Sequence, residues 1–373
     1  MHFLISCGGT GGHLSPGISL AEGLTARGHT ATLLISRKKV DARLSEKYPA
    51  LTFARMPGRP FSWRPIRLLR CLWSQLGAVL YCIRLIARHT PDAIIGFGGF
   101  TSAPVVLAGR LRGVPVALHE ANRVPGLAIR TLGRFATRVY LPPGVRLSSV
   151  GAKATRQLGL PVRQEIVRLP RAEARAALGL EAGPKVLAIL GGSQGAASFN
   201  TWARTQAGVL AAEGIQVYCL TGLDKGQPEV HDFRTRTGAP IKAIFVPFCD
   251  RMAELLSASD LVISRAGAGT IAELIRCETP AILVPYPHAA DNHQRANAAF
   301  FERQGGGLVV DQSQMETLHE EVLDAIFNDW LLRKFRGNLR RMDRANSLDL
   351  MIRDLENLAG TPASPSAPTF VPA

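Results

Sequence analysis

The most constraining feature of this sequence is the stretch at residues 261–297, LVISRAGAGTIAELIRCETPAILVPYPHAADNHQRAN. Its short apolar run at 261–264 is typical of a buried parallel strand. The small residues at 266–270 predict a tight turn that opens a helix, and a second apolar strand at 281–284 leads into a polar loop. This order of strand, turn, helix and strand predicts part of a parallel α/β sheet.

The same stretch groups residues that suit phosphate and sugar hydroxyls. A glycine-rich turn at a helix start exposes backbone N–H groups and the positive end of the helix dipole, which favours phosphate. Glu273, one turn into the helix, can accept hydrogen bonds from the hydroxyls of a ribose. The loop after the second strand adds further polar side chains, namely His288, Asp291, Asn292, His293, Gln294 and Asn297. An ordinary turn between strand and helix does not need so many imidazole and carboxamide groups.

The length and composition of the chain allow two domains. With 373 residues, 46% of them hydrophobic, it can bury two separate cores. The six cysteines are scattered, without Cys-x-x-Cys pairs or zinc-ligand spacing, and predict free thiols in a reducing compartment. The apolar run at 2–6 is too short for a signal peptide, and the longest uncharged apolar stretch, 71–83, is too short to span a bilayer.

The basic charge lies in the first half of the chain. Residues 1–155 hold 21 Lys and Arg against 5 Asp and Glu, whereas residues 156–373 hold 23 against 24. Such a field implies an anionic partner: nucleic acid, anionic lipid or a phosphorylated substrate. No zinc finger, RNP motif or recognition helix supports nucleic acid. A helical pattern at 61–89 mixes arginines with Trp, Leu and Ile, which fits either an interfacial membrane helix or a core helix with a solvated basic face.

Three strand ends in the first half carry glycine-rich or polar residues, at 8–13 (GGTGGH), 96–102 (GFGGFTS) and 119–122 (HEAN). Because sites in parallel sheets form at the carboxyl ends of strands, we expect these residues to lie together. The first turn lacks the G-x-G-x-x-G spacing of dinucleotide sites, but it remains a candidate anion cradle. A strand at 186–190 and the turn at 191–196 (GGSQGA) indicate a second, similar half, with a cleft between the two.

Taken in order, these motifs resemble the peptidoglycan N-acetylglucosaminyltransferases, a family with the GT-B fold. The match covers about residues 1–358 and comprises GGTGGH at 8–13, GFGGF at 96–100, HEAN at 119–122, LPVR at 160–163, GGSQGA at 191–196, FCDRM at 248–252, SRAGAGTIAE at 264–273 and the loop to Gln294 and Asn297. Ala121 departs from the pattern, because the family commonly has Gln there. At His293 some relatives have another glutamine, so Gln294 is the better sugar ligand.

The resemblance implies an α/β chain of two Rossmann-like, doubly wound parallel-sheet domains facing across a cleft. It implies an acceptor- and membrane-binding domain at 1–155 and a UDP-GlcNAc-binding domain at 156–343. We also expect a C-terminal helix at 344–358 that packs back toward the first domain, and a disordered Pro/Ala/Ser-rich tail at 359–373.

The resemblance also implies an activity. An inverting hexosyltransferase would move GlcNAc from UDP-GlcNAc to the C4 hydroxyl of MurNAc in undecaprenyl-pyrophosphoryl-MurNAc-pentapeptide (lipid I), making lipid II for peptidoglycan. The enzyme would lie peripherally on the cytoplasmic face of the cell inner membrane and contact its anionic surface through residues 61–89, with no nucleic acid partner. Another GT-B nucleotide-sugar transferase with a different lipid acceptor stays open as the alternative.

Two other classes fit less well. A dinucleotide-dependent oxidoreductase needs an acidic residue after its second strand to hold a ribose. Here that strand ends in SRKK at 36–39, without a carboxylate. A membrane-binding protein without enzymatic activity would not need the polar residues at the strand ends.

The chain contains no Asp-x-Asp motif, the usual metal-chelating signature of sugar-nucleotide transferases, so we expect no cofactor and no strict metal requirement. The diphosphate then needs backbone N–H groups at 191–195 and a cation, for which Arg163 is the candidate. His13 is the first candidate for the general base, with an orienting or phosphate-binding role left open, and Glu120 is the second. Phe248 and Met252 either flank the uracil or simply pack at a helix start.

The residues carried over from the family complete the expected site. Those for UDP-GlcNAc are Thr10, Gly11, Gly12, His13, Asn122, Arg163, Gly192, Ser193, Gln194, Phe248, Met252, Ala268, Gly269, Thr270, Glu273 and Gln294. Those for the acceptor are Gly98, Gly99 and Asn122.

Overall fold

The structure is a computed structural model that describes residues 1–9, 11–57, 65–192, 194–223, 225–344 and 346–360. Its contacts divide the chain into two units. The first comprises Met1–Ala121, Pro125–Arg163 and the described residues from Asn346 onward, and the second comprises Asn122–Val124 and residues 164–344. The expected boundary after residue 155 thus falls inside the first unit. Thr10, Ser193 and most of the expected tail, 361–373, lie outside the described residues.

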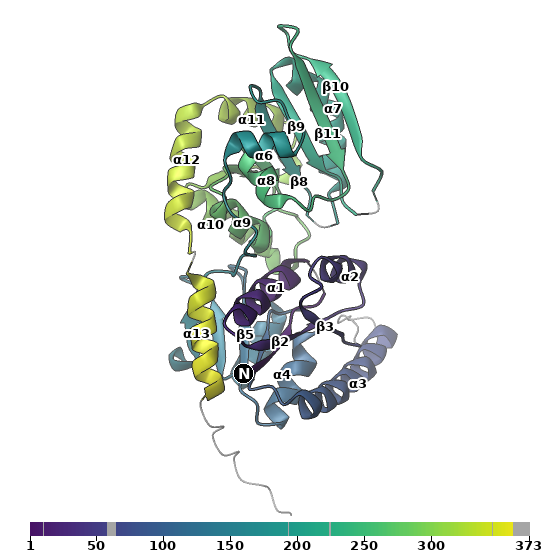
Figure 1. Cartoon of the computed structure of the whole chain (residues 1–373), viewed down its shortest axis with the longest axis vertical. Helices are drawn as coiled ribbons and strands as arrows, with labels where there is room; N and C mark the ends of the chain where they lie inside the picture. The colour runs from purple at the N-terminus through teal and green to yellow at the C-terminus, as the bar shows by residue number, and fades with distance from the viewer. Residues whose placement is uncertain (10, 58–64, 193, 224, 345, 361–373) are drawn as a thin grey trace, which may run out of the picture. The chain divides into compact units, whose positions relative to one another are not determined.

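The first unit is built on a parallel sheet of seven described strands in the order β3-β2-β1-β4-β5-β6-β7 (Figure 1). The first strand of the chain lies inside this sheet, so later strands add on both sides of it, as in a doubly wound fold. The strands are β1 (His2–Ser6), β2 (Thr30–Ile35), β3 (Thr52–Arg55), β4 (Ala93–Gly96), β5 (Val116–His119), β6 (Arg138–Leu141) and β7 (Thr155–Gln157).

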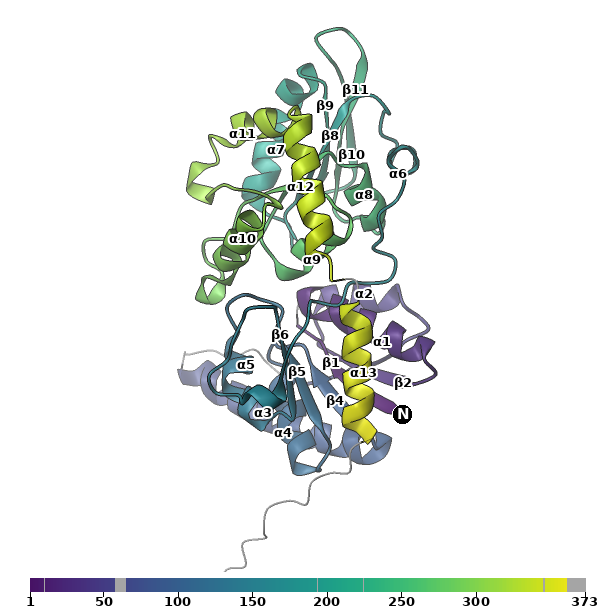
Figure 2. The same cartoon turned by 90° about the vertical axis from the view of Figure 1, so that its left-hand side faces the viewer.

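Helices cover both faces of this sheet, because successive side chains of each strand point to opposite faces. Phe3 and Ile5 pack with α1 (Gly11–Ala26) and α13 (Ser347–Gly360), and Leu4 packs with α3 (Pro65–His89), α4 (Ser102–Leu111) and α5 (Leu127–Leu132). Figure 2 shows α13 beside α1 on the first sheet. The remaining elements are α2 (Lys39–Glu46) and 3-10 turns at Gly133–Phe135 and Ala152–Ala154.

The second unit repeats this plan with the order β10-β11-β9-β8-β12-β13-β14, again counting described strands. All neighbours are parallel except β10 and β11, which are antiparallel. The strands are β8 (Lys185–Leu190), β9 (Ile215–Leu220), β10 (Glu229–Arg234), β11 (Pro240–Val246), β12 (Leu261–Ser264), β13 (Ala281–Leu283) and β14 (Gly307–Val309).

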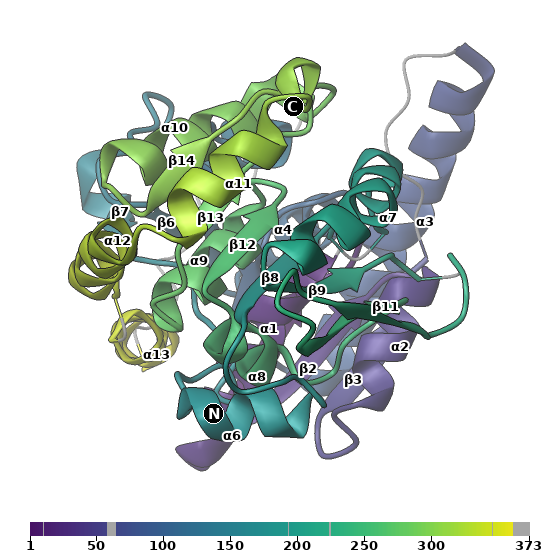
Figure 3. The same ribbon diagram turned by 90° about the horizontal axis from the view of Figure 1, so that it is seen from above.

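Two sets of helices cover the second sheet (Figure 3). On one side α7 (Ala197–Ala212) and α11 (Leu318–Ile326) bury Phe199 and Val322 against Ile189 and Val217. On the other side lie α8 (Met252–Ala258) and α9 (Ala268–Arg276). The other helices are α6 (Arg171–Ala177), α10 (His293–Arg303) and α12 (Asp329–Met342), with 3-10 turns at Ala290–Asn292 and Gln312–Gln314.

The fold class expected from the sequence is confirmed, and the differences are local. Helix α9 begins at Ala268, three residues earlier than the apolar pattern suggests, because Gly267 serves as its N-cap. The helix expected at 344–358 is α13, which belongs to the first unit, and α12 precedes it in the second unit. The polar edge strand β10 was not expected.

The described part of the chain bears on two further expectations. Cys7, Cys82, Cys219, Cys249 and Cys277 are free, as predicted, and all five are buried. None of the described helices is long and apolar enough to cross a membrane.

Candidate active site

Two charged side chains hold the first glycine-rich turn, which links β1 to α1. The Gly9 N–H donates to Oδ2 of Asp41 (2.8 Å), and Lys38 Nζ donates to the Gly9 carbonyl oxygen (2.7 Å). Asp41 is fully buried and also accepts hydrogen bonds from the backbone N–H (2.9 Å) and the hydroxyl (2.6 Å) of Ser36. Because a carboxylate takes the Gly9 N–H, this part of the turn is not the open anion cradle that the sequence suggests.

His13 lies in the first turn of α1, against the glycine turn that follows β4. A Cβ atom on Gly98 would lie 3.4 Å from His13 Nε2, and one on Gly99 would lie 3.2 Å from Nδ1. Both glycines have positive φ (+92° and +74°), which other residues rarely adopt. The Thr101 hydroxyl donates to the Gly8 carbonyl oxygen (3.1 Å) and joins the two turns. The structure therefore brings His13, Gly98 and Gly99 together, while their roles stay predictions.

The end of β5 carries two buried side chains. Glu120 is 5% exposed, and its Oε2 accepts the Gly126 N–H (2.7 Å), which fixes the loop before α5. This bond gives Glu120 a structural task, and its role as a base stays a prediction, as does that of His13. His119 is fully buried 5.3 Å from the Phe97 ring, and burial lowers its pKa to about 4. Its imidazole is therefore neutral at pH 7.

Three other residues that we expected to bind UDP-GlcNAc, the sugar donor, belong to the first unit. Gly11 and Gly12 open α1 and are at least partly exposed. Arg163 is 8% exposed, and its Nη1 donates to the Tyr48 hydroxyl (3.3 Å). Since the turn at 191–196 belongs to the second unit, a shared task of this turn and Arg163 at a diphosphate stays a prediction.

The second glycine-rich turn links β8 to α7, and its backbone packs closely against the backbone that follows β9. Gly192 and Gly195 have positive φ (+82° and +66°), and a Cβ atom on Gly195 would overlap the Thr221 carbonyl oxygen after β9. Gly192 and Gln194 are exposed at the start of α7. The first N–H groups of a long helix open toward this turn, which is the arrangement that binds phosphate.

Arg265, directly after β12, fixes the start of α7 to the neighbouring strand ends. Its Nη1 donates to the Val284 carbonyl oxygen (3.1 Å), and its Nη2 donates to Ser198 Oγ (3.2 Å) and Gln312 Oε1 (2.6 Å). The guanidinium also lies 4.4 Å from the centre of the Phe199 ring. Burial lowers the Arg265 pKa, but a guanidinium stays charged. Arg265 was not among the predicted site residues. The sequence signal that could have found it is a charged residue between a buried strand and a glycine turn.

The start of α9 places the expected donor residues in one helical turn. Gly267 is the N-cap, and Ala268, Gly269 and Thr270 form the first turn, all partly exposed. Glu273 follows one turn later and is half-buried. The turn and the carboxylate are thus at the carboxyl end of β12, where the sequence predicts them.

Asn297 is buried, and both the NH₂ group and the oxygen of its carboxamide form hydrogen bonds within the protein. Its Nδ2 donates to Asn122 Oδ1 (3.0 Å) and to the Ala266 carbonyl oxygen (3.1 Å), and its Oδ1 accepts the Arg123 N–H (2.9 Å). These bonds attach residues 122–124 to the second unit. Asn297 is therefore a structural residue, and Asn122 is oriented by it.

The polar loop before α10 has an unusual backbone. Asp291 and Asn292 both adopt left-handed conformations, with φ of 50° and 57°, which cost energy in residues other than glycine. A cavity of about 480 Å³ opens beside this loop and is lined by Pro285, Tyr286, Pro287, Asn292, Arg295, Asp311, Gln312 and Ser313.

Gln294 and His293 differ in how they are held. Oε1 of Gln294 accepts the Tyr286 N–H (2.9 Å), so its NH₂ group is the part that can donate to a sugar. His293 Nδ1 bonds the carbonyl oxygen of Ala290 (2.7 Å) within its own loop. This geometry agrees with the preference for Gln294 as a ligand.

Phe248 and Met252 flank the loop between β11 and α8. Both are partly exposed, and Met252 is the first residue of α8. Their exposure is compatible with contact to a base, and that role stays a prediction.

Two doubly wound sheets, with glycine turns at the starts of α1, α7 and α9, give the chain the GT-B fold, and the families that match it are glycosyltransferases. The model of the glycosyltransferase family 28 N-terminal domain matches residues 3–141, and that of the family 28 C-terminal domain matches residues 186–337. A crystal structure of Acinetobacter baumannii MurG is 26% identical, with a TM-score of 0.72 over 95% of this chain and 99% of that chain. The glycosyltransferase of kitacinnamycin, 17% identical with a TM-score of 0.68, shares the fold over 95% of this chain and 99% of its own.

The relatives narrow the class to one enzyme. The protein of Opitutus terrae named UDP-N-acetylglucosamine–N-acetylmuramyl-(pentapeptide) pyrophosphoryl-undecaprenol N-acetylglucosamine transferase is 63% identical, over 98% of this chain and 97% of its own. The protein of the same name from Prochlorococcus marinus is 35% identical, over 95% of this chain and 94% of its own. The chain therefore belongs to the MurG family within glycosyltransferase family 28.

Proposed function

We propose that this chain moves GlcNAc from UDP-GlcNAc to the C4 hydroxyl of MurNAc in lipid I, with inversion at the sugar. Transfer of GlcNAc to lipid I, which makes lipid II for the cell wall, is the activity of its family. The observation that carries the assignment of the donor is the exposed glycine turn at the start of α7, fixed by Arg265. It supplies backbone N–H groups for a diphosphate.

The second unit supplies the donor groups. The N–H groups at the start of α7 hold the diphosphate, Glu273 accepts hydrogen bonds from the ribose hydroxyls, and the NH₂ group of Gln294 donates to the GlcNAc. Phe248 and Met252 contact the uracil. Backbone donors and Arg163 stabilise the negative charge that develops on the leaving UDP.

His13 is the proposed general base. Its imidazole takes the proton of the MurNAc C4 hydroxyl as this oxygen forms a bond to C1 of GlcNAc. The bond between C1 and the phosphate oxygen breaks, and its electron pair leaves with UDP. Attack opposite the leaving group inverts the configuration at C1. The glycine turn at Gly98 and Gly99, which leaves room for the His13 ring where a Cβ atom would crowd it, orients this base.

A transfer assay with labelled UDP-GlcNAc and a lipid I analogue tests this function. We expect a labelled disaccharide lipid, retained activity in EDTA, and no product from a matched analogue that lacks the MurNAc C4 hydroxyl. Transfer to a different lipid instead of the lipid I analogue would establish the alternative GT-B activity. Complete loss in EDTA, restored by Mg²⁺, would contradict the assignment of diphosphate charge to protein groups alone.

The first unit is proposed to lie on the anionic membrane that carries lipid I, at the cytoplasmic face of the inner membrane. Three large side chains of α3 are well exposed at helical spacing: Trp73 (74%), Leu76 (52%) and Leu80 (48%). On α4, which packs beside α3, Leu107 (40%) and Leu111 (71%) are exposed as well. The side chains of Arg64, Arg67 and Arg70 lie outside the described residues. Exposed apolar groups within a basic half fit an interfacial site.

A further inference from the structure

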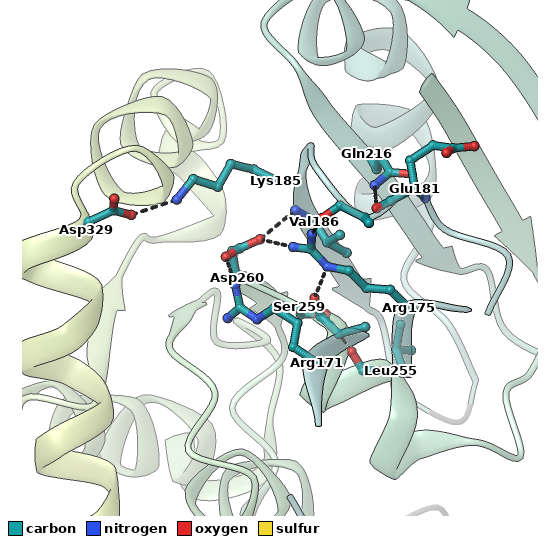
Figure 4. Close-up of polar contacts among 12 residues, drawn as sticks. Arg171, Arg175, Glu181, Lys185, Val186, Gln216, Leu255, Ser259, Asp260 and Asp329 are labelled. Carbon is teal, nitrogen blue, oxygen red and sulfur yellow. Dashed lines mark hydrogen bonds and ion pairs between the residues drawn. The ribbon is translucent and has the colours of Figure 1, made fainter. Parts of the chain in front are cut away.

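A cluster of arginines lies at the amino ends of the strands of the second sheet, around Asp260. This residue directly precedes β12 and is 2% exposed. Its carboxylate accepts the Val186 N–H (2.9 Å) and bonds Arg175 Nη2 (2.8 Å) and Arg171 Nη1. Figure 4 shows Arg171 and Arg175 converging on Asp260. Asp260 is thus neutralised by two guanidinium groups.

A second carboxylate nearby, Glu278, is also paired twice. Its Oε2 bonds Arg168 Nη1 (2.7 Å) and Arg340 Nη2 (2.8 Å), and its Oε1 accepts from Arg340 Nε (2.9 Å). The hydrogen bond from Arg340 lowers the pKa of Glu278. This carboxylate is therefore ionised, and its charge is satisfied.

Arg336 of α12 adds a further positive charge beside the two carboxylates, each of which already pairs with two arginines. Its side chain is 22% exposed, its Nη2 donates a long hydrogen bond (3.4 Å) to the Asp260 carbonyl oxygen, and it lies 3.9 Å from the Asp260 carboxylate. Burial first, and then repulsion by Arg171, lower its pKa. The described cluster holds five guanidinium groups and two carboxylates, which leaves three positive charges uncompensated. The next carboxylates, Asp329 and Asp343, are bonded to Lys185 and Arg276.

Three of the five arginines line a cavity of about 350 Å³. Arg168, Arg171 and Arg336 border it together with the hydroxyl residues Ser257, Ser259 and Thr279. Glu278 also lines it, but two arginines pair with that carboxylate. Guanidinium groups present several N–H donors in a planar fork that matches phosphate. The cavity thus combines excess positive charge with guanidinium groups, the side chains best suited to bind phosphate.

We propose that this cavity is a second anion site of the chain, which binds a phosphate group. The site is separate from the proposed donor site because Asp260 precedes β12, whereas the turn that opens α9 follows it. The two sites therefore lie at opposite ends of one strand. The phosphate comes either from a small dissolved anion or from a lipid headgroup, and the chemistry of recognition is the same for both.

Calorimetric titration of the full chain tests the site, with inorganic pyrophosphate as probe and saturating UDP present to fill the donor site. We expect saturable binding that weakens about tenfold or more in Arg336→Gln, since each charged hydrogen bond contributes strongly. Arg168→Gln is the second variant, because its side chain is 51% exposed and its loss perturbs the fold least. Arg236→Gln is the matched control: it removes an arginine paired with Glu213 elsewhere in the same unit, and pyrophosphate affinity should not change.

A parallel arm measures binding to vesicles of phosphatidylglycerol in phosphatidylcholine. If Arg336→Gln weakens vesicle binding and Arg236→Gln does not, while pyrophosphate does not bind, the phosphate is that of a lipid. The proposal fails if neither probe gives binding that Arg336→Gln or Arg168→Gln weakens, if Arg236→Gln weakens it equally, or if UDP abolishes pyrophosphate binding. Circular dichroism spectra and thermal midpoints of the variants separate loss of binding from loss of fold.

Discussion

The glycine-rich turns of the two units occupy the same place in the fold. Each follows the first strand of its unit, β1 or β8, and opens a long helix, α1 or α7. In each, one glycine approaches the end of the next strand so closely that a Cβ atom would overlap backbone, at Ser36 N for Gly8 and at the Thr221 carbonyl oxygen for Gly195.

The turns differ in what surrounds this backbone contact. The first has a buried carboxylate, Asp41, bonded to the Gly9 N–H, and an ammonium, Lys38, bonded to the Gly9 carbonyl oxygen. In the described part of the second turn no such side chain is bonded, and the Gly195 N–H donates to Gly192 of the same turn (2.9 Å). A phosphate at the first turn would meet the charge of Asp41, which costs energy. Similar glycine patterns thus have different hydrogen-bond partners, and this difference is why we propose the second turn for the diphosphate.

The largest expected effect is that of Gly195→Ala. The new methyl group overlaps the Thr221 carbonyl oxygen at a positive φ, so we expect destabilisation of more than about 4 kcal/mol, in the exceptional range for one substitution. UDP should no longer protect the chain against thermal unfolding. In Gly192→Ala the methyl group meets nothing within 4 Å, and only the strain of about 1 kcal/mol should remain. Similar losses in both variants would contradict the packing argument.

The next effect concerns the first turn. Asp41→Ala leaves the Gly9 N–H and both donors of Ser36 without their acceptor, which should cost at least about 3 kcal/mol in urea denaturation. The affinity of the folded variant for UDP, measured by calorimetry, should stay within about threefold of the parent value, because we propose that the nucleotide binds to the second unit. Asp41→Asn is the control of similar size. Loss of UDP affinity in a folded Asp41 variant would reassign the nucleotide to the first turn.

Acid should destabilise the first unit through His119. Its pKa is about 4 in the folded chain and 6.5 in the unfolded one, so the unfolded state takes up a proton between these values. The contribution to stability is complete above pH 6.5 and is lost as the pH falls toward 4, by about 3 kcal/mol in total. Denaturation from pH 7 to 4 should therefore show a shallower decline for His119→Phe than for the parent chain. Parallel curves would show that this imidazole does not control the acid response.

Substitution of single side chains proposed to bind UDP-GlcNAc in the second unit should have moderate effects on activity. Glu273→Ala and Gln294→Ala each remove a donor-site hydrogen bond of about 1–3 kcal/mol, which should appear in kcat/KM for UDP-GlcNAc and leave the KM for the acceptor unchanged. His293→Ala is the neighbouring control, since His293 bonds its own loop. Unchanged donor kinetics in both variants would remove these residues from the donor site.

The smallest expected effect tests whether the first unit, and not the second, contacts the membrane. Trp73 on α3 and Trp330 on α12 are comparably exposed, at 74% and 62%. Trp73→Ser should weaken binding to anionic vesicles by roughly 1–2 kcal/mol, the apolar contribution of one side chain, whereas Trp330→Ser should not. Vesicle flotation measures both variants. Equal effects, or none, would argue against α3 as the membrane contact.

The sequence predicts the backbone of the site better than its polar contacts. Short apolar runs before glycine turns mark β1, β4, β8 and β12 because buried parallel strands need uniform hydrophobicity. The rule that strand ends converge also places His13 beside Gly98 and Gly99 correctly. Strand β10, EVHDFR, was missed because it is a polar edge strand with little burial.

The spacing of residues along the sequence does not predict polar contacts between segments that are far apart in the chain. Asp41 lies two residues beyond SRKK, which itself holds no carboxylate, and only the fold turns Asp41 toward Gly9. Arg265 bonds groups that are distant in sequence, at Ser198, Val284 and Gln312. Such partners depend on which loops meet at the end of a sheet, and local patterns do not specify that.

The return of the last helix to the first unit has a consequence for biosynthesis. Met351, Ile352 and Leu355 of α13 are buried in the core that contains Phe3 and Ile5 of the first strand. Domains generally fold in the order in which they leave the ribosome. Here the second unit ends before Asn346 and can complete its core while the last residues are still being translated. The first unit, although made earlier, has one face of its sheet covered only in part, by α1, until α13 emerges, so we expect it to finish folding last.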